Sequence, residues 1–306
     1  MEEFKKRIPK LQSAQKIEEI HKGYSFDKKY LVTMNEQEKY LLRTSSAEEY
    51  ERKTTEFAIL HEMKKLQVQS PEPIEIGLLE DKGICYSLFS YVEGEDAKTL
   101  LPIYTTKEQH VIGIAASLDL KRMHCLQAPS TTESWYPRIT KKHKRYIDAY
   151  KTCGKRIHSD HRLIEFIETN VDYLKNRPNR FQHDDFHPGN ILVKDKQYSG
   201  VIDFERFDWG DPYHDFVKVG MFSCETSIPF SIGQITGYFN GEIPEYFWRL
   251  YSIYLVMTIF SSIVWTLKVV PDTIDEMMER LSRVMEDHKN FESLTPDWFL
   301  KGLSNK

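Results

Sequence analysis

Hydrophobic and polar residues follow each other in short runs over the first ninety residues of the chain. Residues 30–34 (YLVTM) and 40–43 (YLLR) are typical of β-strands, and a polar turn separates them. Residues 47–66 place apolar side chains near helical spacing, opposite a charged face. Residues 74–79 and 84–89 favour two more strands with a turn between them. The pattern predicts a small β-rich region around one long helix.

The pattern changes after residues 91–94. Residues 106–126 have the apolar spacing of a long helix, and residues 135–180 are helical and polar. A basic run at residues 141–145 (KKHKR) is typical of a solvated helix face. The last sixty residues are again helical and rich in aromatic side chains. This second part of the chain is therefore expected to be mostly helical.

Together the two patterns predict an α+β fold with two lobes. The small β-rich lobe covers residues 1–92, and a crossing segment lies at about residues 89–94. The larger, mostly helical lobe covers residues 95–306. This arrangement predicts a cleft between the lobes, where small-molecule sites tend to lie.

One long uncharged segment could suggest a membrane protein. Residues 250–267 (LYSIYLVMTIFSSIVWTL) approach the length of a membrane span. Seven of these residues are Ser, Thr or Tyr, however, and acidic helical sequence follows directly. We expect a buried core helix and no membrane partner.

Composition narrows the class of protein. The chain has 306 residues, of which 40% are hydrophobic and 29% are charged, an ordinary globular balance. Lys and Arg total 42 against 46 Asp and Glu, which argues against nucleic acid as a partner. The four cysteines are scattered, and the N-terminus has no apolar stretch of signal-peptide length. We expect a cytoplasmic protein with reduced thiols; no feature predicts its oligomeric state.

The strongest chemical signal lies in residues 181–204 (FQHDDFHPGNILVKDKQYSGVIDF). Two apolar runs joined by turn-forming residues predict a hairpin. Asp185 and Asn190 precede its first strand, and Asp203 follows its second strand. Carboxylate and amide oxygens suit Mg²⁺, and a further carboxylate beside a metal can accept a proton from a hydroxyl. The segment thus has the parts for metal-assisted phosphoryl transfer.

These residues resemble a known family. Residues 183–190 (HDDFHPGN) match the H-x-D-x-x-x-x-N catalytic loop of protein kinases and aminoglycoside phosphotransferases. Residues 202–204 (IDF) stand where kinases have D-F-G, and residues 210–215 (GDPYHD) match the G-D-P-x-x-D signature of the antibiotic kinases. The chain resembles the aminoglycoside phosphotransferase family, which implies a bilobal, protein-kinase-like fold. A protein kinase would need a long activation segment, and G-D-P follows Asp203 too soon for one.

The resemblance implies a role for each of these residues. Asp185 would be the catalytic base that orients the acceptor hydroxyl, and Asn190 and Asp203 would hold Mg²⁺ against the phosphates of ATP. His183 would support the loop through hydrogen bonds. Asp211 and Asp215 would be structural and tether the segment after the metal site.

The small lobe is implied to bind the nucleotide. Arg43 would take the place of the usual strand lysine, because Arg can also bind phosphate in a bidentate way. Its predicted partner is Glu56 on the following helix, although Glu51 or Glu62 could serve. The loop at residues 21–26 would cover the phosphates. The backbone groups of Ser90 and Val92 would meet the adenine edge, and the choice between ATP and GTP stays open.

The acceptor is expected to be a small molecule with a hydroxyl, and an aminoglycoside or macrolide antibiotic is the first candidate. A polycationic aminoglycoside would need acidic side chains; the candidates are Glu205, Asp208, Glu225, Glu242 and Glu245. A macrolide would need an apolar wall, for which aromatic side chains are available, although core packing is the usual role of such residues; they are Tyr238, Phe239, Tyr246, Phe247, Trp248, Tyr251, Tyr254 and Trp265.

Three other functions stay open from the sequence. The same scaffold serves metabolic kinases of sugars, choline and amino alcohols, because fold does not determine substrate. A catalytically inactive nucleotide-binding protein of this fold is a second alternative, although Asp185, Asn190 and Asp203 are all present. A third is a transition-metal hydrolase in which His183 and His187 join Asp185 as ligands.

Overall fold

The computed structural model describes residues 2–21 and 27–304 and divides the chain into two compact units. The first unit contains residues 1–94 and 199–205, and the second contains residues 95–198 and 206–306. Residues 199–205, which the sequence assigned to the larger lobe, thus group with the first unit. Of the loop predicted to cover the phosphates, only His21 is among the described residues.

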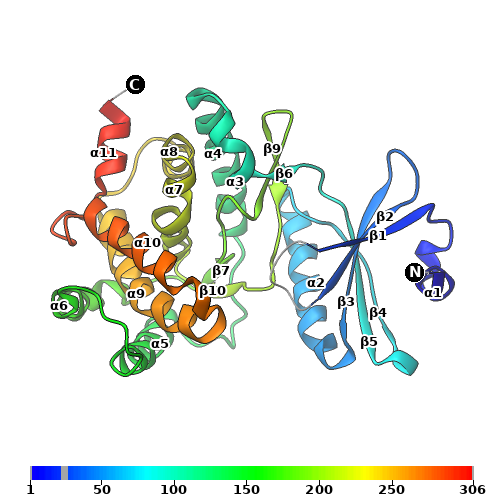
Figure 1. Ribbon diagram of the computed structural model, residues 1–306, viewed down its shortest axis with the longest axis horizontal. Coiled ribbons are helices and arrows are strands. Elements are labelled where there is room, and N and C mark those ends of the chain that lie inside the picture. Colours follow the sequence, from blue (N-terminus) through cyan, green and yellow to red (C-terminus); the bar gives the residue numbers. More distant parts are fainter. Residues whose placement is uncertain (1, 22–26, 305–306) are drawn as a thin grey trace. The chain divides into compact units, whose positions relative to one another are not determined.

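The first unit is built on a five-stranded antiparallel sheet with the order β1-β2-β3-β5-β4 (Figure 1). Alternate residues of β2 are buried, because side chains of a strand point to opposite faces of the sheet. Tyr30 and Val32 of that strand share a core with Ile8 and Leu11, which follow the short helix α1 (Glu2–Arg7). The strands are β1 (Lys16–Ile20), β2 (Lys28–Thr33), β3 (Lys39–Ser46), β4 (Pro73–Leu79) and β5 (Ile84–Ser90).

The one long helix of this unit is α2 (Tyr50–Lys65), as the sequence predicted. It begins after a 3₁₀ turn at Ala47–Glu49, whose N-terminus is capped by the Ser46 hydroxyl. Its buried face carries the expected Leu60 and Met63, but also two charged side chains, those of Lys53 and Glu56. Buried charges need partners, which are Arg43 of β3 for Glu56, and Asp27 and Glu205 for Lys53.

The second unit is mostly helical, so the structure confirms the predicted α+β fold with a β-rich and a helical part. Its short strands are β6 (Glu95–Asp96), β7 (Arg180–Gln182), β8 (Ile191–Lys194) and β10 (Asp208–Gly210), and β9 (Gln197–Val201) runs on into the first unit. Its helices are α3 (Ala97–Leu100), α4 (Thr106–Met123), α5 (Trp135–Tyr150), α6 (Asp160–Asn170), α7 (Cys224–Thr226), α8 (Ile228–Tyr238), α9 (Glu245–Val269), α10 (Ile274–Asp287) and α11 (Asp297–Ser304).

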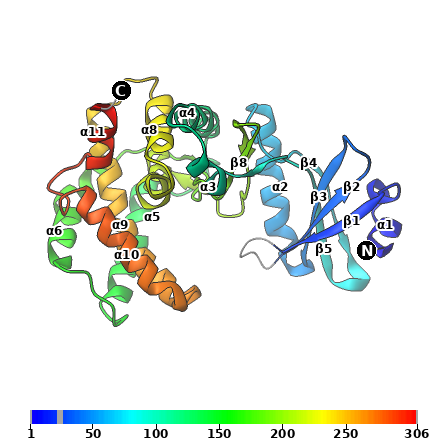
Figure 2. The same ribbon diagram turned by 45° about the horizontal axis from the view of Figure 1, so that its top comes forward.

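Helices α4 and α8 lie side by side at backbone contact distance (Figures 1 and 2). A Cβ atom at Gly113 would come within 2.1 Å of the Phe230 carbonyl oxygen. A Cβ at Gly233 would come within 2.2 Å of the His110 carbonyl oxygen. Glycine is therefore required at both positions for the two helices to approach so closely.

Helix α9 is the core of the second unit. It is long and apolar enough to cross a membrane, yet 67% of its most apolar stretch is buried inside the protein. Tyr251, Tyr254 and Phe260 are completely buried, and α5, α6 and α10 pack against the helix. The predicted buried core helix is confirmed.

Candidate active site

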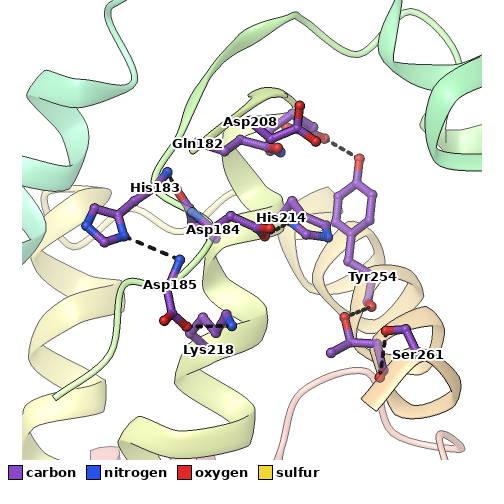
Figure 3. A network of polar contacts seen from close by, with 12 residues as sticks. Gln182, His183, Asp184, Asp185, Asp208, His214, Lys218, Tyr254 and Ser261 are labelled. Carbon is purple, nitrogen blue, oxygen red and sulfur yellow. Dashed lines mark hydrogen bonds and ion pairs between the residues drawn. The ribbon is translucent and has the colours of Figure 1, made fainter. Parts of the chain in front are cut away.

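The loop between β7 and β8 carries His183, Asp184 and Asp185. The Asp215 carboxylate accepts the backbone N–H groups of His183 and Asp184, at 2.8 Å and 2.7 Å. Asp184 has a left-handed backbone (φ 58°), which aspartate tolerates better than most residues. His183 is fully buried, and its Nδ1 accepts the N–H of Asp185 at 3.3 Å. The histidine thus supports the loop, as the sequence predicted (Figure 3).

Both carboxylate oxygens of Asp185 have partners. Oδ1 accepts a hydrogen bond from Lys218 Nζ at 2.8 Å and lies 3.5 Å from His187 Nε2. Oδ2 accepts from Asn190 Nδ2 at 3.2 Å. Burial would raise the pKa of Asp185, but its contact with His187 and the positive charge of Lys218 hold it well below its usual value. The carboxylate is therefore ionised and fixed in orientation.

Asp184 points away from Asp185, toward His214 (Figure 3). Its Oδ1 lies 3.4 Å from His214 Nδ1, beyond good hydrogen-bond geometry. Burial would raise the pKa of Asp184, but His214 and the charges of Lys218 and Lys142 lower it to about 2. The two neighbouring carboxylates thus have separate partners and different surroundings.

The buried carboxylates of Asp211 and Asp215 hold the next segment in place. Asp211 accepts two hydrogen bonds from Arg177, at 2.6 Å and 3.0 Å, and a third from the Tyr254 hydroxyl at 2.8 Å. Asp215 also lies 3.0 Å from His124 Nε2. Their predicted structural role is confirmed, because both tie this segment to other parts of the same unit.

The two predicted magnesium ligands lie in different units. Asn190, in the second unit, donates its amide nitrogen to Asp185, which leaves the amide oxygen for a ligand. Asp203, in the first unit, is exposed and has a left-handed backbone (φ 69°). Both supply oxygen ligands of the kind that Mg²⁺ prefers, so their chemistry fits the metal.

The transition-metal alternative finds no support in the described residues. Among residues 2–21 and 27–304, no group of three His, Cys, Asp or Glu side chains is placed to hold a metal ion. His183 instead supports the loop, and the ring of His187 packs near that of Phe222, with 5.3 Å between ring centres.

Arg43 and Glu56 form a buried ion pair in the first unit. Arg43 Nη1 donates to Glu56 Oε1 at 2.7 Å, and the arginine is only 8% exposed. The alternatives Glu51 and Glu62 do not make this contact; Glu51 is exposed, and Glu62 pairs with Lys65. The sequence therefore identified the correct glutamate.

Three more charged residues surround this pair, and their arrangement was not predicted from the sequence. Arg43 donates to Asp27 at 2.7 Å and forms an ion pair with Glu205. Lys53 contacts the same two carboxylates, at 2.5 Å and 2.6 Å. We call Asp27, Arg43, Lys53, Glu56 and Glu205 the arginine cluster. The only signal in the sequence was that Lys53 and Glu56 share one face of α2.

Burial and charge act in opposite directions on these groups. Burial would lower the pKa of Arg43, but Glu56 and Asp27 raise it above its usual value. Burial and the charge of Arg43 lower the pKa of Lys53. Lys29, which lies opposite Arg43 in the sheet, has its pKa lowered by the same two causes. The carboxylates of the arginine cluster therefore offset a local concentration of cations.

Ser90 presents less of its backbone than the sequence suggested. Its N–H donates to the Glu72 carbonyl at 2.9 Å, and its hydroxyl accepts the Glu72 N–H at 2.8 Å. Only the carbonyl of Ser90 is left for an adenine edge. Val92 follows the end of β5, beyond the strand.

Most of the acidic side chains suggested for an aminoglycoside pocket are already paired. Glu205 belongs to the arginine cluster, and Asp208 forms an ion pair with Arg138. Glu225 accepts two hydrogen bonds from Arg280, at 2.6 Å and 3.1 Å. Glu225, Glu242 and Glu245 are exposed, and Glu225 is paired with Arg280.

The aromatic wall suggested for a macrolide is mainly core. Phe247, Tyr251 and Tyr254 are completely buried, and Tyr238 is 9% exposed. Tyr246 is 53% exposed, and Trp265 is partly exposed beside Arg206. Their helical spacing thus reflects packing around α9 rather than a ligand surface.

Comparisons with known proteins identify the family of the chain. The phosphotransferase enzyme family (APH) matches residues 16–248, which is more than half of the chain. The chain belongs to this family, and its class is that of a small-molecule kinase. No curated protein matches the chain.

Solved structures of aminoglycoside phosphotransferases share the fold. A ternary complex of APH(4)-Ia with ADP and hygromycin B has a TM-score of 0.69 at 13% identity, covering 92% of this chain and 96% of that one. The gentamicin complex of APH(2'')-IIa has a TM-score of 0.65 at 17% identity, covering 92% and 95%. At this level of identity the likeness shows the fold alone.

Proposed function

We propose that this protein transfers the γ-phosphate of ATP to a hydroxyl of a small molecule and depends on Mg²⁺. The observation that carries the proposal is the ionised carboxylate of Asp185, held by Lys218 and Asn190 within the loop that matches the family. A fixed, partly exposed carboxylate can accept the hydrogen of a substrate hydroxyl. We place this reaction in the cytoplasm.

Asp185 is the catalytic base in this proposal. Its carboxylate orients the acceptor hydroxyl and takes its proton as the oxygen attacks the γ-phosphorus. The bond from that phosphorus to the bridging oxygen breaks, and ADP leaves. Phosphoryl transfer passes through a loose transition state, in which the bond to the leaving group is largely broken before the new bond forms. The acceptor hydroxyl therefore loses its proton late, so its orientation contributes more to the rate than the strength of the base.

Asn190 and Asp203 are the proposed ligands of Mg²⁺. Bound there, the ion would neutralise charge on the phosphates. The family motif and the oxygen donors of both side chains support this assignment.

The first unit is the proposed nucleotide-binding lobe. Arg43, held by Glu56, is the proposed cation for the phosphates, and the chain at Ser90 and Val92 is the proposed adenine contact. The APH(2'')-IIa neighbour has been solved with streptomycin and ATP, and the aminoglycoside 2'-phosphotransferase-IIIa neighbour with GDP. ATP is our first choice, with GTP as the alternative donor.

An antibiotic of the aminoglycoside or macrolide type is the first acceptor to test, given the family. One observation favours a second candidate, a metabolic kinase of a sugar or amino alcohol. Asp208 and Glu225 are paired with Arg138 and Arg280, so a polycation would have to displace these arginines. An acceptor with little positive charge fits these pairs better than a polycationic one.

The test is ADP production with ATP and Mg²⁺ against a panel of aminoglycosides, macrolides, sugars and amino alcohols. One class of acceptor should raise turnover well above background, and Asp185→Asn should abolish that increase. Asp195→Asn, an exposed aspartate in the β8–β9 turn, is the matched control. Absence of nucleotide binding, with or without metal, would refute the proposal, and binding without any turnover would favour an inactive protein.

A further inference from the structure

Lys218 reaches Asp185 because of its place in the chain. It lies three residues after Asp215, about one helical turn further on, and therefore on the same side of the segment. Asp215 accepts the backbone N–H groups of His183 and Asp184, and Lys218 contacts the side chain of the next residue, Asp185. Two successive turns of one segment thus hold three successive residues of the loop.

The lysine is itself held in place. Its side chain is 16% exposed, and its Nζ lies 5.5 Å from the centre of the Phe222 ring. The residues after it, Val219–Ser223, form a π-helix, a rare conformation often found at functional sites. Within that turn, a Cβ at Gly220 would come within 2.2 Å of the Tyr251 hydroxyl, so the turn is packed closely against α9. The position of Lys218 is therefore set by the core.

We propose that Lys218 is a positioning residue for the phosphoryl transfer, one that acts by fixing the carboxylate plane of Asp185. This inference rests on the proposed function, in which Asp185 is the base. Lys218 holds Oδ1 and Asn190 holds Oδ2, so rotation about the carboxylate would break one contact or the other. Lys218 gives up no proton in this role; the proton of the acceptor hydroxyl goes to Asp185.

His187 is the other candidate for holding Oδ1. Its Nε2 is 3.5 Å from that oxygen, whereas Lys218 Nζ is at 2.8 Å. Its Nδ1 accepts the N–H of Gly189 at 3.1 Å and so helps to shape the loop. The contact from Lys218 is the shorter one, and Lys218 comes from a different, closely packed segment of the chain. We therefore assign the positioning role to the lysine.

A double-mutant cycle on the full-length protein tests the proposal. Lys218→Met should lower kcat about 100-fold, since a misplaced catalytic group can cost that much, and should leave KM for ATP within about threefold. Lys218→Arg should recover most of this loss. In the Asp185→Asn background, Lys218→Met should change the residual rate less than about twofold, because residues that act through each other are not additive.

Lys144→Met, which removes an exposed lysine of α5, is the control and should have no effect. An equal loss from Lys218→Met in both backgrounds would overturn the proposal, because Lys218 would then act independently of Asp185. An unchanged or raised kcat would overturn it as well. Loss of activity in Asp185→Asn alone concerns the proposed function and not this inference.

Crystal structures of the wild type and Lys218→Met provide a test that needs no acceptor. The Asp185 carboxylate should occupy one conformation in the wild type and a second rotamer in the variant. An Asp185 carboxylate that keeps the same single orientation without Lys218 would contradict a positioning role, whatever the activity of the protein.

Discussion

The arginine cluster of the first unit and the surroundings of Asp185 in the second unit are both buried groups of charges, but they differ in design. In the first, Arg43 is 8% exposed and its guanidinium contacts three carboxylates. In the second, a carboxylate is central, with one lysine at 2.8 Å and an amide as partners. The first arrangement engages most of the N–H donors of its central arginine, whereas the second orients a carboxylate for a ligand. Charge pairing alone therefore does not identify a reactive group.

The largest expected effect is on turnover from the second group. Asp185→Asn should lower kcat by about 10²–10⁴, the range for loss of a general base. Thermal unfolding should change little, since the amide keeps the size of the side chain. Steady-state kinetics and calorimetry on one preparation would check both. A large loss of stability with intact turnover would mean that Asp185 stabilises the fold and does not serve the reaction.

Arg43→Met should lower stability, apart from its effect on nucleotide binding through the proposed phosphate contact. It would leave Asp27, Glu56 and Glu205 with Lys53 as the one cation of the arginine cluster, and loss of one partner in a buried ion pair costs about 3–5 kcal/mol. Urea unfolding would measure the loss. Arg43→Lys, which keeps the charge, should cost less, and an equal cost for both variants would contradict an electrostatic origin.

Lys53→Met should destabilise less than Arg43→Met. Lys53 binds Asp27 and Glu205, but burial and the charge of Arg43 lower its pKa, so part of its benefit is offset by repulsion. We expect a loss of about 1.5–3 kcal/mol, the range for hydrogen bonds to charged groups, because Arg43 still pairs with both carboxylates. The exposed Lys64→Met on the same helix is the control. A larger loss than for Arg43→Met would mean that the lysine is the centre of the group.

Another effect concerns pH and lies outside both groups. Burial lowers the pKa of His143 and of His288 to about 4. The unfolded chain therefore binds more protons than the folded one between about pH 6.5 and 4, and stability falls as pH falls through this window. Each histidine contributes about 1.4 kcal/mol per pH unit. His288→Gln should flatten the slope of unfolding free energy against pH, and an unchanged slope would contradict this origin.

Asp27 and Asp185, one from each group, have pKa values below the usual range of aspartate. Ion pairing lowers the pKa of Asp27 despite its burial, so its stabilisation is lost only as pH falls below about 3.8. In acid unfolding, the stability lost through the two histidines should therefore disappear at higher pH than the stability lost through Asp27.

The loop at residues 183–190 and the pairing of Arg43 with Glu56 could be predicted because their residues resemble the motifs of a known family. The strands β2 to β5 and the helix α2 also follow from residue patterns. The grouping of Asp27 with Glu205 could not be predicted, because 178 positions separate them and no periodicity links a turn to a residue after a hairpin. Lys218 was missed for a related reason: a lysine near a helix end is typically solvated, and only the packing of the π-helix buries it.

The return of residues 199–205 to the first unit has a consequence for synthesis on the ribosome. The first unit cannot be completed when residue 94 has emerged, because roughly a hundred residues must be translated before its last segment appears. At typical elongation rates this delay is about 5–20 s. During that time Arg43 and Lys53 lack their contacts with Glu205, and only Asp27 and Glu56 balance their charges. A truncated chain that ends near residue 94 lacks residues 199–205, so it should not reproduce the first unit of the full protein.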